Sequence, residues 1–416
     1  MQVFKFGGAS VKDADGVRNV VKVLEKVGYE NKLIIVSAMG KTTNALEAVI
    51  DKYLNETNTY KAELETVKNY HRDIMMDLFK NEQHVVFNKV EGLFKELQQF
   101  FISNKSPNYN FIYDQVIGYG ELVSTTIISQ YLNMMHLTNT WLDVRQCIKT
   151  DDYYRRANVD WEITQNNIIN KVKASTLYIT QGFIASDSNN FTTTLGREGS
   201  DYTAAIFAYC LNAQSVTIWK DVPGVLNGDP RHFNNTQLLN TISYTEAIEL
   251  AFYGASVIHP KTLQPLQRKE IPLHVKSFLN PENAGTTVNK SQGIEPKVPC
   301  FILKQNQVLI SLSTLDFSYV VEENISEIFN LLALYKMKVD VIQNSAISFS
   351  VCFENTYNNL EKLLLHLKAK FKVECHKQVS LYTIRHYNDT VIKNLEQGKT
   401  VLLKQLFQET VQVVTQ

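Results

Sequence analysis

The feature that most restricts the possible folds is a recurrence of short apolar runs bounded by glycine, most of them followed by a longer stretch with helical periodicity. The runs are Val3–Phe6, Leu33–Val36, Leu177–Thr180 and Val216–Trp219. This alternation favours a largely parallel sheet whose faces are covered by helices. We therefore expect an α/β fold for this part of the chain.

The length of 416 residues allows two or three domains. Between about residues 45 and 115 the pattern changes to long polar helices with spaced leucines and aromatics, such as Tyr60–Phe79 and Val85–Phe101, which predicts a helical insertion. Proline, glycine, asparagine and serine gather in residues 280–299. We therefore predict a catalytic domain over residues 1–294 and a second domain over residues 295–416.

Short elements follow this boundary in the order strand, helix, strand, strand, helix, which is ferredoxin-like. A second, shorter round runs from Val379 to Thr415. The second domain is therefore expected to be α+β, with two units of which the second is abbreviated. The elements of the first round are expected at Val308–Ser313, Ile325–Tyr335, Lys338–Gln343, Ala346–Phe353 and Tyr357–Leu367.

Composition excludes several classes of function. Lysine and arginine total 42, as do aspartate and glutamate, so no general surface for nucleic acid or anionic membrane is expected. No stretch approaches the roughly 20 apolar residues of a membrane span, and the N-terminus lacks a signal-peptide pattern. Five scattered cysteines without a C-x-x-C pair argue against a disulfide framework and a zinc site. We expect a cytoplasmic protein with a local phosphate site and no metal ligands supplied by the chain.

The segment Lys5-Phe6-Gly7-Gly8-Ala9-Ser10 ends the first predicted strand. Its two glycines let the backbone approach an anion, and Lys5 and Ser10 add a charge and a hydroxyl. This pattern predicts a phosphate cradle. A plain strand-to-helix turn with an exposed lysine remains the alternative.

The segment Thr194-Leu195-Gly196-Arg197-Glu198-Gly199-Ser200-Asp201 precedes a predicted helix, Tyr202–Cys210. Ser200 and Asp201 are suitable N-cap residues, so an anion here would meet backbone amides, the helix dipole and Arg197 together. An ordinary capped helix with a solvated arginine is the alternative.

The loop Trp219–Arg231 follows a β-branched strand at the carboxyl end where open α/β sheets bind nucleotides. Arg231 is a candidate phosphate ligand there, and a turn with a surface arginine is the alternative.

In Gly118-Tyr119-Gly120-Glu121-Leu122-Val123-Ser124 a lone carboxylate opens an apolar helical run. Glu121 could accept an ammonium group, or it could stabilise the start of a helix.

Taken in order, these segments resemble the aspartate kinases of the amino-acid kinase superfamily over essentially the whole chain. KFGGAS resembles the opening signature of that family, and the most diagnostic block is TLGREGSDYTA. Further blocks that resemble the family are VSAMGKTTN, GYGELVS, TQGFIA, KDVPGVLNGDPR, YGASVIHPKT and SFLNPENAGTTV. The region after residue 295 resembles the paired ACT domains that sense end-product amino acids in this family.

The resemblance implies ATP-dependent phosphorylation of the side-chain carboxylate of L-aspartate, with Mg²⁺ held mainly by the nucleotide phosphates. The catalytic residues it implies are Lys5, Arg197 and Asp201. The residues it implies around aspartate are Thr43, Glu121, Phe183, Arg197 and Ser200. The residues it implies for the nucleotide are Lys5, Gly7, Gly8, Ser10, Lys220, Asp221, Leu226 and Arg231. It also implies an amino-acid effector and a homodimer joined through the ACT region.

Four positions depart from the family pattern in ways that matter below. Glu198 replaces a common glycine, and Ser256 stands where many relatives have a phosphate-contacting lysine. Leu226 occupies a position often held by tyrosine. Glu323 replaces a glycine of the effector loop, whereas Asp340 and Ser345 match that pattern.

Two alternatives remain at this point. One is a related kinase acting on glutamate, acetylglutamate or a nucleotide monophosphate. The other is a non-catalytic amino-acid sensor, against which the joint presence of Lys5, Glu121, Arg197 and Asp201 argues.

Overall fold

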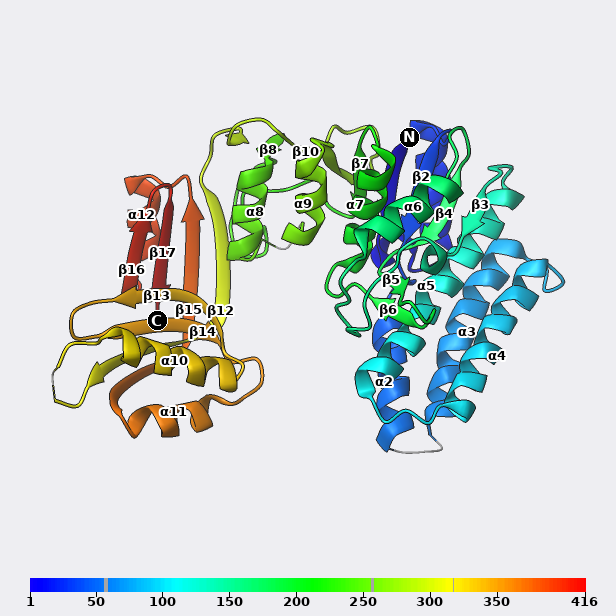
Figure 1. Ribbon diagram of the computed structural model, residues 1–416. Helices are drawn as coiled ribbons and strands as arrows, with labels where there is room; N and C mark the ends of the chain where they lie inside the picture. Colours follow the sequence, from blue (N-terminus) through cyan, green and yellow to red (C-terminus); the bar gives the residue numbers. More distant parts are fainter. Residues whose placement is uncertain (56–58, 256–257, 317) are drawn as a thin grey trace. The chain divides into compact units, whose positions relative to one another are not determined.

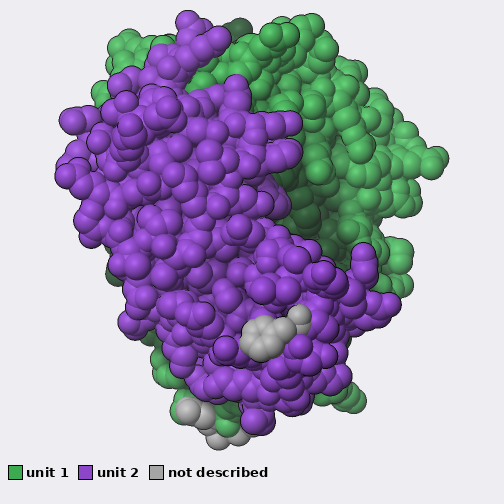
Figure 2. All heavy atoms as spheres, turned by 90° about the vertical axis from the view of Figure 1, so that its left-hand side faces the viewer, with its two compact units in different colours: residues 1–225, 238–248, 257–294 green, residues 226–237, 249–256, 295–416 purple. Residues whose placement is uncertain are grey.

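The computed structural model describes residues 1–55, 59–255, 258–316 and 318–416. The chain divides into two compact units, coloured separately in Figure 2. The first consists of Met1–Val225, Leu238–Ile248 and Val257–Ile294. The second consists of Leu226–Gln237, Glu249–Ser256 and Glu295–Gln416. Two short internal segments therefore group with the C-terminal part of the chain.

Among the described residues, the α/β fold has a nine-stranded sheet in the order β11-β8-β10-β9-β7-β1-β2-β4-β3 (Figure 1). β1 pairs in parallel with β2 and β7, so that Lys5 lies opposite Ile35 and Ile218. The four apolar runs predicted as strands are β1, β2, β4 and β7. The bounds are β1 (Gln2–Phe6), β2 (Lys32–Val36), β3 (Thr140–Leu142), β4 (Tyr178–Gln181), β7 (Val216–Lys220), β8 (Thr241–Ser243), β9 (Leu273–Ser277), β10 (Thr286–Asn289) and β11 (Ile294–Glu295).

The predicted polar helices are present as α3 and α4. The helices up to residue 268 are α1 (Ala14–Val27), α2 (Thr42–Asn55), α3 (Tyr60–Phe79), α4 (Val85–Ser103), α5 (Tyr109–Met134), α6 (Trp161–Lys171), α7 (Gly199–Leu211), α8 (Tyr244–Tyr253) and α9 (Pro260–Arg268). Short 3-10 turns, η1 (Gly8–Val11) and η2 (Val144–Gln146), and a hairpin of β5 (Ile184–Ser186) with β6 (Thr192–Thr194) complete this part. No helix within the described ranges is long and apolar enough to span a membrane.

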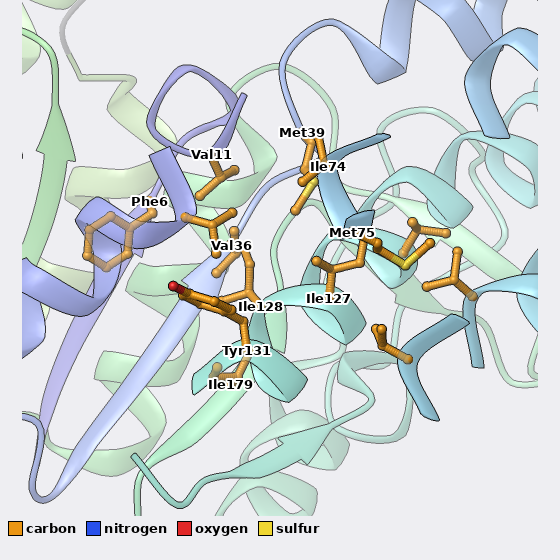
Figure 3. Close-up of a cluster of buried hydrophobic side chains, with 14 of the residues drawn as sticks. Phe6, Val11, Val36, Met39, Ile74, Met75, Ile127, Ile128, Tyr131 and Ile179 are labelled. Carbon is orange, nitrogen blue, oxygen red and sulfur yellow. The ribbon is translucent and has the colours of Figure 1, made fainter. Parts of the chain in front are cut away.

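One apolar core joins the strands to helices α1–α5 of the first unit. Figure 3 shows part of it, in which Phe6 and Val36 come from β1 and β2, and Ile127 and Tyr131 come from α5. Met75 on α3 belongs to the same cluster. The inserted helices α3 and α4 therefore belong to the same core, in which α3 packs against α1, α2 and α5, and α4 packs against α5.

The second unit contains a six-stranded antiparallel sheet in the order β13-β14-β12-β15-β17-β16. Its order β12-α10-β13-β14-α11-β15 confirms the ferredoxin-like prediction. Two strands are longer than predicted, because β12 and β15 each continue for 15 residues through both halves of the sheet. The bounds are β12 (Cys300–Thr314), α10 (Glu322–Leu334), β13 (Lys338–Asn344), β14 (Phe349–Glu354), α11 (Leu360–Lys368), β15 (Phe371–Arg385), α12 (Asp389–Glu396), β16 (Val401–Phe407) and β17 (Thr410–Thr415).

Candidate functional site

A cavity of about 460 Å³ opens in the first unit, where β1 and β7 end and α7 begins. This is the carboxyl edge of parallel strands, at which open α/β sheets bind ligands. Its lining brings together eight of the predicted site residues, and it adds six others. The predicted ones are Lys5, Thr43, Glu121, Phe183, Arg197, Ser200, Asp201 and Lys220; the others are Ser37, Tyr113, Arg155, Gly196, Glu198 and Gly199.

Lys5 and Asp201 form an ion pair inside this cavity. Lys5 Nζ lies 2.6 Å from Asp201 Oδ1, and the two side chains are 11% and 2% exposed. A charge pair so nearly removed from water is electrostatically strong, and either charge would be costly if its partner were lost. The pair therefore fixes one positive charge at the end of β1.

The start of α7 is built differently from the prediction. Glu198, in the left-handed region at φ 53°, is the N-cap residue, and Ser200 and Asp201 lie in the first turn. The prediction that Ser200 and Asp201 cap the helix is wrong. The left-handed backbone explains why the family pattern described above commonly has glycine at the position of Glu198. Ser37 Oγ donates to Ser200 Oγ at 3.0 Å, which joins the end of β2 to the first turn of α7.

Glu121 is a buried carboxylate in the middle of the 26-residue helix α5, not at a helix start as its sequence context suggested. The Ala38 N–H donates to Glu121 Oε1 at 3.3 Å, and Oε2 is buried without a hydrogen-bond partner among the described residues. Burial raises the pKa of Glu121 to about 8, although the Ala38 amide opposes this. An uncompensated acceptor in a cavity wall is suited to a ligand ammonium.

Glu198 adds a carboxyl group to the end of the cavity that contains Lys5 and Asp201, which the sequence did not predict. Burial raises the pKa of its carboxyl, and the nearby charge of Asp201 adds to this effect. Three cations act on the same carboxyl in the opposite direction, and in order of effect they are Lys220, Lys5 and Arg197. This end of the cavity therefore holds three cations, Lys5, Arg197 and Lys220, and two acidic residues, Glu198 and Asp201.

Tyr113 and Arg155 also line the cavity and were not predicted. The Arg155 guanidinium carbon lies 4.4 Å from the centroid of the Tyr113 ring. No local motif marks either residue, because α5 carries Tyr113 and a distant loop carries Arg155. Ser37, by contrast, could have been found, since it belongs to the VSAMGKTTN block.

Several predicted nucleotide residues do not line the cavity. A Cβ on Gly8 would lie 2.7 Å from the Ala38 carbonyl oxygen, so this glycine is required by close backbone packing. Ser10 is buried and donates to the Trp219 carbonyl oxygen at 3.4 Å. Gly7 and Asp221 also fall outside the lining.

Two further nucleotide candidates, Leu226 and Arg231, belong to the second unit. Arg231 is 82% exposed and pairs with Asp229 at 2.6 Å, as a turn with a surface arginine would. Ser256 lies outside the described residues.

Among the residues that the structure describes, no group of three or more histidine, cysteine, aspartate or glutamate side chains has a metal-binding arrangement. The carboxylate of Asp201 lines the cavity, and its Oδ1 forms an ion pair with Lys5. The donor set fits a divalent ion that takes most of its oxygen ligands from a nucleotide.

Comparisons with known proteins agree on one family. Residues 1–277 match the amino acid kinase family. Lysine-sensitive aspartokinase 3 of Escherichia coli strain K12 is 32% identical over 394 residues, which cover 92% of this chain and 86% of that protein.

Two solved structures of the E. coli aspartokinase III are similar over 100% of this chain at 28% identity. The T-state complex with lysine and aspartate has a TM-score of 0.83 and is covered over 95% of its length. The R-state complex with aspartate and ADP has a TM-score of 0.79 and is covered over 96%.

Proposed function

The chain belongs to the amino acid kinase family, as one of its aspartokinases, and we propose that it transfers the γ-phosphoryl group of ATP to the side-chain carboxylate of L-aspartate. The products are ADP and 4-phospho-L-aspartate, the entry to lysine, threonine and methionine synthesis. The observation that carries this proposal is the cavity in which the unpartnered carboxylate of Glu121 faces the same space as the Lys5–Asp201 pair.

The amino-acid end of the substrate is assigned to α5 and the 196–197 loop. Glu121 Oε2 accepts the ammonium, which replaces the missing hydrogen bond and makes the ionised carboxylate favourable. Arg197 makes no ion pair with the described residues and offers a two-pronged donor to the α-carboxylate. Thr43, Phe183 and Ser200 complete the walls around the substrate.

The side-chain carboxylate of aspartate is then directed to the cationic end of the cavity. One of its oxygens attacks the γ-phosphorus, the new O–P bond forms, and the bond to the bridging oxygen breaks so that ADP leaves with the electron pair. No proton has to move. Lys5, held by Asp201, neutralises charge on the transferring group, and Lys220 adds a second cation.

We assign the nucleotide to the loops after β1 and β7. Gly7, Gly8 and Ser10 supply a narrow backbone turn, and Asp221 is a proposed contact from the loop after β7. For Leu226 and Arg231, which belong to the second unit, a nucleotide contact stays a prediction from the resemblance. A Mg²⁺ ion bound with ATP would neutralise phosphate charge, and Asp201 is the carboxylate that could help to hold it. The site of action is proposed to be the cytoplasm, on the sequence features given above.

We assign regulation to the second unit, through an amino-acid effector. A homodimer is proposed to form through this unit, because the edge strands β13 and β16 carry exposed apolar side chains such as Ile342, Leu406 and Phe407. The mass from solution scattering tests this, and a monomer at working concentration would exclude it.

The function is tested by ATP-dependent acyl-phosphate formation trapped with hydroxylamine, with L-aspartate, L-glutamate and N-acetyl-L-glutamate compared in parallel. Of the three substrates, only L-aspartate is expected to give a hydroxamate. A preference for either glutamate compound, or ATP binding without any acyl phosphate, would contradict the proposal.

A further inference from the structure

Arg155 occupies a backbone conformation that a residue with a side chain adopts only when its surroundings require it. It lies in the loop between η2 and α6 at φ 72°, in the left-handed region that favours glycine. The same residue lines the cavity of the proposed kinase. A side chain kept at such a position calls for a function that glycine could not serve.

The backbone of Arg155 is tied to the cavity by a fully buried carboxylate. Asp114 Oδ2 accepts the N–H groups of Arg155 and Thr194, each at 2.9 Å, and its Oδ1 accepts the Thr194 hydroxyl at 2.8 Å. A Cβ on Gly196 would lie 3.3 Å from the Arg155 carbonyl oxygen. Arg155 therefore packs directly beside the residue that precedes Arg197.

The guanidinium of Arg155 packs against the rings of two tyrosines and forms no ion pair with a carboxylate among the described residues. It lies 4.4 Å from the centroid of Tyr113 and 5.6 Å from that of Tyr109. Tyr113 is itself fixed, because its hydroxyl donates to Glu47 Oε1 at 2.9 Å. Arg155 has no ion pair within the part of the chain that the structure describes. A cation held on ring faces keeps its N–H donors available at the ring edges, where an anionic ligand can accept them.

The place of Arg155 beside α5 favours the α-carboxylate of the amino acid over a phosphate of ATP as the bound anion. Tyr113 and Glu121 lie on the same face of α5, about two helical turns apart. Lys5 and Lys220, in contrast, come from the strands β1 and β7. Arg155 thus approaches from the side that carries the ammonium acceptor. We propose that Arg155 is a second guanidinium, beside Arg197, for the substrate α-carboxylate, and so determines specificity for an amino acid with a free α-carboxylate; this inference rests on the proposed kinase function.

The most informative variant is Arg155→Gly, because glycine suits φ 72° and removes the side chain without straining the fold. The matched control is Arg156→Gly, since Arg156 stacks on Tyr153 and is absent from the cavity lining. For Arg155→Gly we expect the KM for L-aspartate to rise at least about tenfold, the loss of one charge-assisted hydrogen bond. The KM for ATP and kcat should stay within about twofold, and the melting temperature should be unchanged or higher.

Two readouts separate recognition from mere structure. L-Aspartate α-amide keeps the reacting carboxylate but lacks the α-carboxylate, so its kcat/KM should be the same in wild type and Arg155→Gly. Thermal stabilisation by L-aspartate without ATP should weaken in Arg155→Gly and persist in Arg156→Gly.

An active wild type whose two glycine variants behave alike would overturn this inference alone. A wild-type protein that neither phosphorylates nor binds aspartate would overturn both this inference and the proposed function.

Discussion

Lys5 and Asp201 lie 2.6 Å apart at the cationic end of the cavity, and Asp201 is almost completely buried. Lys5→Ala is expected to lower kcat at least about 100-fold, the usual loss when one preorganised charge stabiliser is removed. It should also lower the melting temperature, because Asp201 would keep a buried charge without its partner.

The double variant Lys5→Ala/Asp201→Asn separates the two effects. It removes both charges, so thermal stability should recover while kcat remains low. Near-normal turnover in a folded Lys5→Ala protein would show that Lys5 does not contact the transferring phosphoryl group.

Arg197→Lys is expected to raise the KM for aspartate more than the KM for ATP. An ammonium cannot reproduce the two parallel hydrogen bonds that a guanidinium makes with a carboxylate. Steady-state kinetics with each substrate varied in turn measure the difference. If only the KM for ATP changes, Arg197 serves the nucleotide.

The raised pKa of Glu121 predicts a pH dependence of substrate binding. With a pKa of about 8 in the ligand-free cavity, the Glu121 carboxyl is protonated near pH 7 and must lose its proton to bind an ammonium. The KM for aspartate should therefore fall as pH rises from 6 to 7.5, by about tenfold per pH unit at most. Glu121→Gln should bind aspartate weakly with no such slope.

The same group affects stability with a definite sign. Because its folded-state pKa lies above the unfolded value, Glu121 stabilises the ligand-free protein fully only below its ordinary pKa of 4.5, and this contribution is lost progressively as pH rises to about 8. The melting temperature of the ligand-free protein should thus fall less between pH 5 and 8 in Glu121→Gln than in wild type. An equal fall in both proteins would contradict a raised pKa.

Inhibition by lysine is expected to be weak or absent, although the similar E. coli enzyme is named for its lysine sensitivity. Glu323, where relatives have glycine, is exposed in the first turn of α10 and adds a side chain and a charge to the effector loop. Asp340, which matches the effector pattern, is already paired with Lys304 at 2.7 Å. Initial rates against rising lysine and threonine measure the effect, and Lys304→Ala should increase the response to lysine. Strong inhibition of the wild type by low lysine would refute this expectation.

The regular elements of the fold were predictable because hydrophobic period and length are local properties. The strands of the parallel sheet and the bounds of α3 follow from them. The position of Glu121 did not, because Gly118 and Gly120 resemble helix breakers in sequence. In the structure they permit close packing, since a Cβ on Gly120 would lie 3.0 Å from the Ala38 Cβ.

Long-range contacts account for the other differences. The place of Arg155 in the cavity depends on Asp114, which is 41 residues away in sequence. The full length of β12 could not be predicted from the sequence, because the middle of the strand is polar. It contains Asn306 at φ 57°, beside a register shift in the pairing with β15. Such irregularities are stabilised by neighbouring strands and leave little trace in the local pattern.

The central claim is that Glu121 and Arg197 hold the amino-acid end of aspartate so that its side-chain carboxylate reaches the Lys5–Asp201 pair. Reduction of the enzymatic acyl phosphate with borohydride identifies the carboxylate that was phosphorylated. The account predicts homoserine as the product, formed only when ATP and L-aspartate are both present. Its yield should be much lower with Lys5→Ala. Recovery of 3-amino-4-hydroxybutanoate, the product of α-carboxylate phosphorylation, would contradict it.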